Sequence, residues 1–379
     1  MCVLVAIAVA AILIGIFGSR QKPGWYTVES ASGGLHCGRE FLLTYEYGAG
    51  DRKAAEEGKE LSKLYTTLTE NAWQLFYSEA GESALGNLYR VNTHPNEEVA
   101  VDPALYEAFR LLESLGSRLH YLGPVYNAYD QVFANSEAVL AAEVDPGQNA
   151  DLRQYVLELS GYAADPNAIR LELRPDNKVF LHVSDAYKTF FEENMEAVYV
   201  DFGWLRNAFI IDYMAQKLEE NGFTNGHITS IDGFSRNLDR RDGKYQLNLF
   251  NRRGDKTELA ASMAYSGAAS MVYLRTYDSS RAYAFQGGRV VTYFVDIADG
   301  QCKTALENLV SYSDKAGCAE IAIKLAPSFI AYNFSSAEVN NLAGEEIYSI
   351  WFEDHVLRYN QAELKLTPRS DAYILTHTK

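Results

Sequence analysis

The chain has 379 residues, of which 47% are hydrophobic and 22% are charged. This is the composition of an ordinary globular protein, with enough residues for one large domain or two small ones. The formal net charge of −16 would repel a phosphate backbone, so the composition argues against nucleic acid as a partner.

The N-terminus predicts a membrane anchor. Residues 1–18 carry no charged side chain and are rich in alanine, valine, isoleucine and leucine. Such a run is just long enough to cross a bilayer, and neither a basic segment nor a small-residue cleavage site marks it as a removed signal. We therefore expect residues 1–19 to form a transmembrane anchor or uncleaved signal, with a cleaved signal peptide as the alternative. Arg20 and Lys22 favour a cytoplasmic location for the residues that follow.

The rest of the chain divides into a linker and one domain. Residues 20–35 contain several glycines and serines, as linkers do, and residues 36–379 show no internal repeat. Helical and β-like patterns mix without the regular alternation of βαβ units. The sequence therefore predicts an α+β or mixed α/β fold.

The first predicted elements of the domain are a strand over residues 41–47 and a long helix with Asp51 as its cap. Asp102 followed by Pro103 predicts the start of a second helix, and Gly116 is expected to end it. The apolar stripes of both helices are typical of core-facing helices.

The second half of the chain is richer in β patterns. Residues 171–173 and 179–183 flank a polar turn and predict a hairpin, followed by a helix over residues 184–194. Further strands are expected over residues 197–202, 245–250, 271–277, 289–295 and 347–352, and a helix is expected over residues 317–326.

The most informative stretch is residues 200–222, in which a predicted strand turns into an amphipathic helix. Asp201, Gly203 and Asp212 keep the spacing of D-x-G-x-x-x-K-G-x-x-x-D, with Asn207 at the lysine position. In this pattern the chain resembles the FAD:protein FMN transferase (ApbE) family. Taken alone, the same residues also fit a helix cap and a tight turn.

Two further segments match the family in the same order. Asp232 and Gly233 stand at or next to its G-G-[DN] turn, where a glycine serves either close backbone approach to a ligand or an ordinary turn. Residues 288–300 align without a gap to G-k-x-Y-x-H-I-x-D-P-x-T-G. Asp296 is kept, and Tyr293 replaces the histidine. Asp296 alone also fits a strand-end carboxylate held by backbone amides.

The last segment, residues 318–326, resembles A-D-A-x-A-T-A. In the family that Asp and Thr bind Mg²⁺ together with a carbonyl of the D-x-G turn. The resemblance therefore implies Glu320, Lys324 and the Trp204 carbonyl as metal ligands, although Lys324 brings a positive charge to the site. A solvent-facing Glu320–Lys324 ion pair is the alternative. Residues 122–133 fall near the family's G-A-F-D region.

The resemblance implies a flavin cleft between two α/β halves and a reaction that splits FAD and joins FMN to a Thr or Ser of an acceptor protein. It also implies a location at the cell membrane, with an extracytoplasmic domain. The alternative is a flavin-binding or partner-binding protein on the same fold that lacks catalysis. The implied flavin contacts are Asp201, Gly203, Asn207, Asp212, Asp232, Gly233 and Asp296, and the implied catalytic residues are Asp296 and Tyr293.

The pairing state of the cysteines depends on whether the domain lies in an oxidising compartment. Cys302 and Cys318 form a disulfide if the domain is exported, and free thiols are the alternative. The spacing of the cysteines does not indicate a zinc site.

Overall fold

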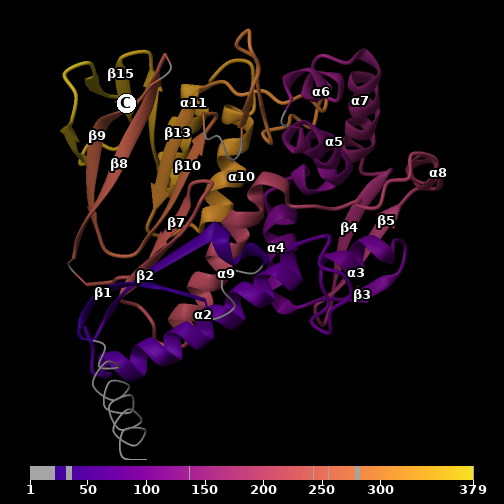
Figure 1. Cartoon of the computed structure of the whole chain (residues 1–379). Coiled ribbons are helices and arrows are strands. Elements are labelled where there is room, and N and C mark those ends of the chain that lie inside the picture. The colour runs from indigo at the N-terminus through magenta and orange to yellow at the C-terminus, as the bar shows by residue number, and fades with distance from the viewer. Residues whose placement is uncertain are drawn as a thin grey trace, which may run out of the picture.

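The computed structural model describes residues 22–30, 36–135, 137–241, 243–254, 256–277 and 282–378. These residues build a nine-stranded sheet with helices on one face, which confirms the predicted α+β class (Figure 1). Neighbouring strands of this sheet are antiparallel, apart from the last pair at the C-terminal edge. In spatial order the strands are β1 (Gly24–Val28), β2 (Phe41–Tyr47), β6 (Gly226–Ser230), β7 (Phe234–Asn237), β10 (Ala269–Arg275), β13 (Asn308–Ser313), β14 (Tyr348–Glu353), β15 (Val356–Tyr359) and β17 (Ile374–His377).

Smaller sheets flank the large one. A three-stranded sheet packs on its helix-free face, where Leu249 and Met263 contribute to a second core with Met271 and Val310. The strands of this sheet are, in spatial order, β16 (Lys365–Pro368), β9 (Lys256–Ser266) and β8 (Lys244–Arg253). A second three-stranded sheet consists of β3 (Glu98–Ala100), β5 (Lys178–Val183) and β4 (Ile169–Arg174). A two-stranded sheet pairs β11 (Ala282–Ala284) with β12 (Val290–Thr292).

The helices gather on the opposite face and at one side. Four of them, α2, α9, α10 and α11, contact the large sheet, and α5, α6 and α7 form a group at one side, above β4 and β5 in the view of Figure 1. The helices are α2 (Ala54–Phe76), α3 (Leu88–Thr93), α4 (Pro103–Ser114), α5 (Gly123–Ala134), α6 (Ala138–Glu143), α7 (Ala150–Ala164), α8 (Asp185–Glu193), α9 (Arg206–Glu220), α10 (Cys318–Phe329) and α11 (Ser336–Asn341), with 3-10 turns η1 (His36–Glu40), η2 (Leu119–Leu122), η3 (Gly203–Leu205) and η4 (Leu342–Glu345).

Strand β10 shows why the sheet can carry a core on each face. Successive side chains of a strand point to opposite faces. Val272 and Leu274 therefore join the core under the helices, whereas Met271 and Tyr273 join the core under β8 and β9. An apolar run without polar alternation is the sequence form of a strand buried on both faces.

Most predicted elements are present, and several details differ. Residues 24–28, which fall in the predicted linker, form β1 and pair with β2. Asp102 caps α4 by accepting a hydrogen bond from the Ala104 N–H, as predicted. Asp51 does not cap α2, which begins at Ala54 after Lys53, a residue without a side-chain cap. The strand expected over residues 289–295 is confined to β12.

The strand predicted over residues 197–202 does not form. The backbone N–H and C=O of Val200 bond to the side-chain amide of Asn92, and the N–H of Asp201 bonds to the His120 carbonyl. A side chain and a lone carbonyl thus satisfy the backbone groups of Val200 and the N–H of Asp201, in place of a neighbouring strand.

The predicted anchor over residues 1–19 lies outside the described residues. Among the residues that are described, no helix has both the length and the apolar character needed to cross a membrane. Cys302 and Cys318 are free thiols, so the structure agrees with that alternative and not with a disulfide between them.

Candidate functional site

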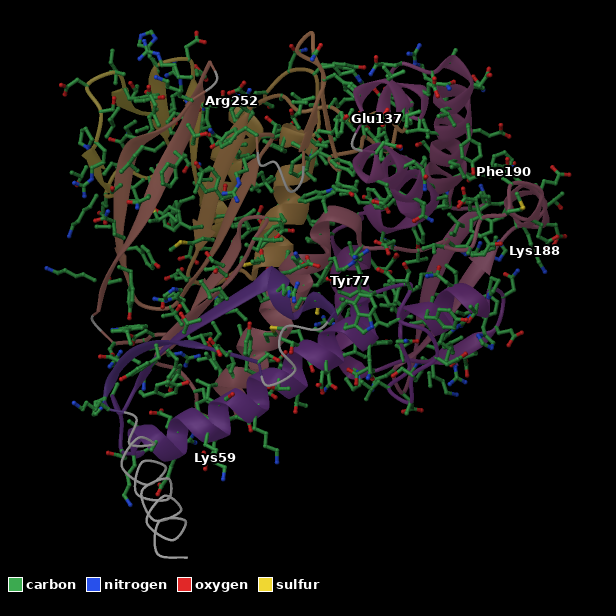
Figure 2. The ribbon with its side chains drawn as sticks, viewed as in Figure 1. Lys59, Tyr77, Glu137, Lys188, Phe190 and Arg252 are labelled. Atoms are coloured by element: carbon green, nitrogen blue, oxygen red, sulfur yellow. The ribbon has the colours of Figure 1, made fainter. Side chains whose placement is uncertain are left out.

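The centre of the molecule holds a polar cluster where α2 ends beside the start of α9. Figure 2 shows Tyr77 in this interior position, whereas Lys59 of α2 and Lys188 of α8 lie at the outside of the molecule. Tyr77 is 3% exposed, and its hydroxyl donates a hydrogen bond to Glu40 at 2.9 Å. The predicted flavin contacts of α9 begin within this cluster.

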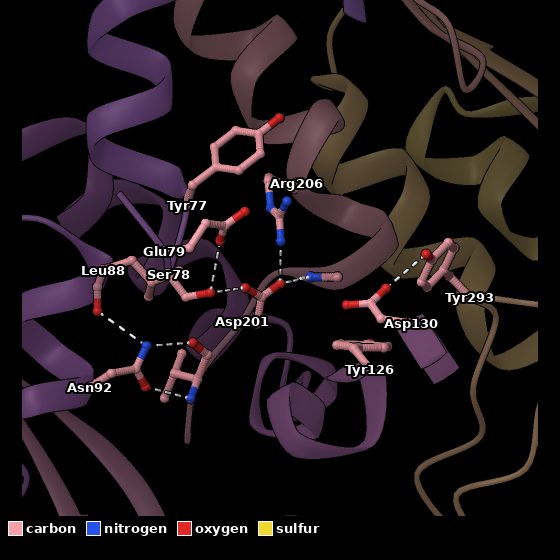
Figure 3. A network of polar contacts seen from close by, with 12 residues as sticks. Tyr77, Ser78, Glu79, Leu88, Asn92, Tyr126, Asp130, Asp201, Arg206 and Tyr293 are labelled. Carbon is pink, nitrogen blue, oxygen red and sulfur yellow. Dashed lines mark hydrogen bonds and ion pairs between the residues drawn. The ribbon is translucent and has the colours of Figure 1, made fainter. Parts of the chain in front are cut away.

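The turn before α9 is organised around the carboxylate of Asp201, which is buried (Figure 3). One oxygen accepts from the Gly203 N–H at 2.7 Å and from the Arg206 guanidinium at 2.8 Å. The other oxygen accepts from the Ser78 hydroxyl at 2.8 Å. All three partners belong to the protein, so Asp201 fixes the shape of the turn and the position of Arg206.

Gly203 is required by the packing of this turn. Its φ is +52°, and a Cβ built on it would lie 2.3 Å from the ring of Tyr126. A side chain at this position would therefore meet both backbone strain and the buried ring of Tyr126. The backbone that carries Trp204 is thus held between Tyr126 and the Asp201 carboxylate.

Arg206 is a functional candidate that the sequence did not single out, because it falls at an unspecified position of the D-x-G pattern. Its guanidinium carbon lies 4.2 Å from the centroid of the Tyr77 ring, a cation–π contact. The Glu79 carboxylate lies 3.2 Å from the Ser78 hydroxyl, which shares its one proton between Glu79 and Asp201. The start of α9 therefore combines one guanidinium with several carboxylates.

Asn207 links two parts of the site. Its amide nitrogen donates to Glu40 at 2.9 Å and to Asp232 at 3.0 Å, and its buried amide oxygen has no partner among the described residues. Gly233, the residue after Asp232, has a φ of +104°, and its lack of a side chain leaves room for the Tyr273 carbonyl of β10. Asn207 thus ties η1 to the turn between β6 and β7.

Asp212 lies one helix turn further along α9 and holds α10. Its two carboxylate oxygens accept from the N–H groups of Cys318 and Ala319, each at 2.8 Å. Burial raises the pKa of Asp212 to about 6, against the opposing effect of these two hydrogen bonds. The structure therefore places Asp212 as the cap of α10, a position from which it orients the helix that carries Glu320 and Lys324.

Tyr293, which the motif resemblance aligns with the family's histidine, contacts α5. Its hydroxyl donates to Asp130 at 2.8 Å, and its ring stacks on Phe133 at 4.3 Å between centroids. Asp130 is a second residue that the sequence reasoning did not place. A signal was available, because Ala128-Tyr129-Asp130 matches A-F-D of the family's G-A-F-D with Tyr for Phe.

Asp296 is paired to a buried lysine. The ammonium of Lys303 lies 2.9 Å from Asp296 and 2.7 Å from Asp299, and 4.2 Å from the centroid of the Tyr332 ring. The N–H of Ala298 also bonds to Asp296 at 2.9 Å. Asp296 is therefore held in place by Lys303 and by the Ala298 N–H, whether it serves as a strand-end carboxylate or as a site residue.

The structure brings some predicted residues together and separates others. Trp204, Asp232 and Tyr293 line one void of about 20 Å³ at the start of α9. Asp296 opens onto a different cavity of about 650 Å³, which also borders α10 at Ile323. Trp204, Asp232 and Tyr293 therefore lie together, and Asp296 lies apart from them at the other cavity.

The proposed metal ligands do not suit Mg²⁺. The Lys324 ammonium bonds to Glu320 at 2.5 Å and to Glu345 of η4 at 2.7 Å. Burial alone would lower the pKa of Lys324, but these two carboxylates raise it above its ordinary value. A protonated lysine offers no lone pair to a metal. In the described part of the chain, no group of three or more His, Cys, Asp or Glu side chains is placed to hold a metal ion.

The sequence matches no protein-family model, and no curated protein matches it either. Solved structures do. An ApbE protein from Thermotoga maritima is 12% identical, with a TM-score of 0.59 over 86% of this chain and 94% of that one. The chain has the ApbE fold.

Two more structures with the ApbE fold agree with this result. The flavin transferase ApbE from Vibrio cholerae is 11% identical, with a TM-score of 0.53 over 88% of this chain and 94% of that one. The flavinyl transferase ApbE from Pseudomonas stutzeri is 11% identical, with a TM-score of 0.52 over 93% and 95%. At such identities the likeness shows the fold, as the resemblance of the motifs implied.

Proposed function

We propose that this protein binds a flavin at the start of α9 without a divalent metal, and that Mg²⁺-dependent transfer of FMN is weak or absent. The observation that carries the proposal is the position of Lys324. Its ammonium is held between Glu320 and Glu345, where the resemblance implies a metal ion. The ApbE fold supports flavin as the ligand.

The transfer reaction needs a cation beside the pyrophosphate of FAD, because charge builds up on the phosphoryl oxygens as the bond between the phosphates breaks. Lys324 replaces the oxygen ligand that would help to hold this cation. Two cations a few Å apart repel, and in a partly dry cleft the repulsion amounts to several kcal/mol, on the order expected for an intermediate dielectric. Mg²⁺ would therefore bind poorly beside Lys324.

Proton transfer is also weakened. A histidine at position 293 would change its charge near neutral pH, whereas an ordinary tyrosine keeps its proton until about pH 10. Tyr293 also donates that proton to the carboxylate of Asp130. Tyr293 can therefore orient a ligand or an acceptor hydroxyl, but it is a poor base.

The second candidate is FAD:protein FMN transfer to a Thr or Ser of an acceptor protein. The observation in its favour is the Tyr293–Asp130 pair. Asp130 accepts the tyrosine hydroxyl and reaches the molecular surface, where it would also accept a proton from an acceptor hydroxyl. In this case the ammonium of Lys324 would have to serve in place of the metal.

The double variant Glu320→Asp with Lys324→Thr separates these candidates. It restores an oxygen ligand pair and removes the competing cation, so we expect Mg²⁺ to bind more tightly and FAD to be split faster than in the parent chain. Mg²⁺ binding is measured by calorimetry and FAD cleavage by the release of AMP. A parent chain that already transfers FMN, at a rate that the double variant does not improve, would show that Lys324 is no obstacle.

We further propose that residues 1–19 anchor the protein in the cell membrane, with the domain outside the cytoplasm. The support for the anchor is the uncharged run of 18 residues, close to the length of about 20 that a spanning helix needs. The support for a location outside the cytoplasm is the resemblance to the ApbE family, against the charges of Arg20 and Lys22. The full chain should sediment with membranes, and a chain lacking the run should be released. Recovery of the intact full chain in the soluble fraction would contradict an anchor.

A further inference from the structure

Trp204 is unusual for a buried tryptophan. Its side chain is 5% exposed, and its ring packs edge-on against Phe294 with 5.2 Å between centroids. Phe294 packs in turn against Phe329 of α10 at 4.9 Å. In contrast to this close apolar packing, the indole N–H has no hydrogen-bond partner among the described residues. Buried tryptophan N–H groups usually have one.

The ring lies at the edge of a void of about 20 Å³, room for one water molecule at most. Two kinds of side chain surround this void. Phe234, Leu274 and Phe294 give it apolar walls, and Asp232, Arg275 and Tyr293 bring polar groups to it. A few polar groups set among apolar walls are the composition of a small-molecule site. An indole is many times larger than the void, so removal of the Trp204 ring would open a slot of ring size between these walls.

The backbone of Trp204 has little freedom to move. Gly203 before it is held against Tyr126, and its N–H is bound to the Asp201 carboxylate. Only the side chain can leave the slot, by rotation about its own bonds. An unsatisfied buried N–H costs about 1–3 kcal/mol, so the inward position of the indole is less stable than its packing alone would make it.

We propose that the indole of Trp204 occupies a ring-binding slot, and that the planar ring of a flavin takes its place when the ligand binds. The inference rests on the flavin-binding function proposed above and adds the residue that decides access to the site. The apolar walls would cover the faces of the ring. The polar groups of Asp232, Arg275 and Tyr293 would meet its edge, where a flavin ring carries both donors and acceptors.

Because the indole must leave first, the parent chain should bind a flavin with a lower apparent affinity than a chain without the indole. A ligand that binds only after the indole has left is weakened by the fraction of molecules in which the slot is open. Removal of the indole abolishes this loss. We expect Trp204→Ala to bind riboflavin about tenfold more tightly than the parent chain, which corresponds to about 1.4 kcal/mol.

The test is a titration of riboflavin, which lacks a phosphate, followed by the fluorescence of the flavin. The parent chain, Trp204→Ala and Trp204→Phe are compared, because the smaller phenyl ring should tighten binding to a lesser degree and is the safer variant for folding. Trp25→Ala is the matched control, since Trp25 lies half-exposed on β1 and should leave the affinity unchanged.

The outcomes distinguish the ring slot from flavin binding itself. Tighter binding by folded Trp204 variants, without a change in Trp25→Ala, supports the slot. Riboflavin binding by the parent chain with no gain in either Trp204 variant would overturn the slot and leave flavin binding standing. An absence of flavin binding in the parent chain and in every folded variant would overturn both.

Discussion

Replacement of Asp201 by alanine should lower the free energy of unfolding by about 3–5 kcal/mol, as removal of one partner from a buried ion pair usually does. The Asp201 side chain is 6% exposed and that of Arg206 is 21% exposed, so water cannot fully replace the lost carboxylate. The Gly203 N–H would lose its acceptor as well, and the Ser78 hydroxyl would keep only Glu79. Because these groups shape the start of α9, flavin affinity should fall with stability.

Chemical denaturation measures the first effect, and a flavin titration of the folded variant measures the second. Asp201→Asn keeps one oxygen for the Gly203 N–H, and its NH2 group can donate to the Ser78 hydroxyl oxygen, so this variant should cost less than alanine. Glu107→Ala is the matched control, because its ion pair with Arg110 is more than half exposed on both sides and should contribute little. An Asp201→Ala variant as stable as Glu107→Ala would show that the Asp201–Arg206 pair does not hold the turn.

Replacement of Gly203 by alanine should be similarly harmful. A left-handed backbone costs a residue other than glycine about 1–2 kcal/mol, and overpacking against the Tyr126 ring adds roughly 1–3 kcal/mol. The expected loss of unfolding free energy is therefore roughly 2–5 kcal/mol. Thermal or denaturant unfolding of the purified variant measures it.

Gly116 supplies the control for this second experiment. Its φ of +63° is close to that of Gly203, but nothing lies within 4 Å of the Cβ that alanine would add. Gly116→Ala should therefore show the backbone cost alone. Equal losses in the two variants would mean that contact with Tyr126 contributes nothing, and that the turn is less tightly packed than the structure indicates.

The fold could be predicted from the sequence because the motifs that indicate it involve residues close together in the chain. The D-x-G turn, the helix that follows it and the hairpin over residues 171–183 all depend on residues close in sequence. The strand predicted over residues 197–202 failed for the opposite reason. Its hydrogen bonds go to Asn92 and to His120, which lie far away in sequence, and no local pattern reveals such partners.

Motif spacing predicts which positions belong to the candidate site, but it does not predict the contacts of their side chains. Asp201 and Tyr293 were found from motif spacing. Their partners Arg206 and Asp130 were missed, since motif spacing does not show which side chains meet across the fold. Lys324 is the instructive case. The sequence raised both a metal position and an ion pair with Glu320, and the structure shows the ion pair and adds Glu345 from η4.

The most direct test of the account is the affinity of the full chain for FAD with and without Mg²⁺. Calorimetric titrations are run in EDTA and in millimolar Mg²⁺, on the same preparation in detergent. A flavin site that uses no metal predicts one FAD bound per chain, with dissociation constants that agree within about twofold between the two buffers. Binding that appears only with Mg²⁺, or that tightens more than about tenfold with it, would contradict the central role given to Lys324.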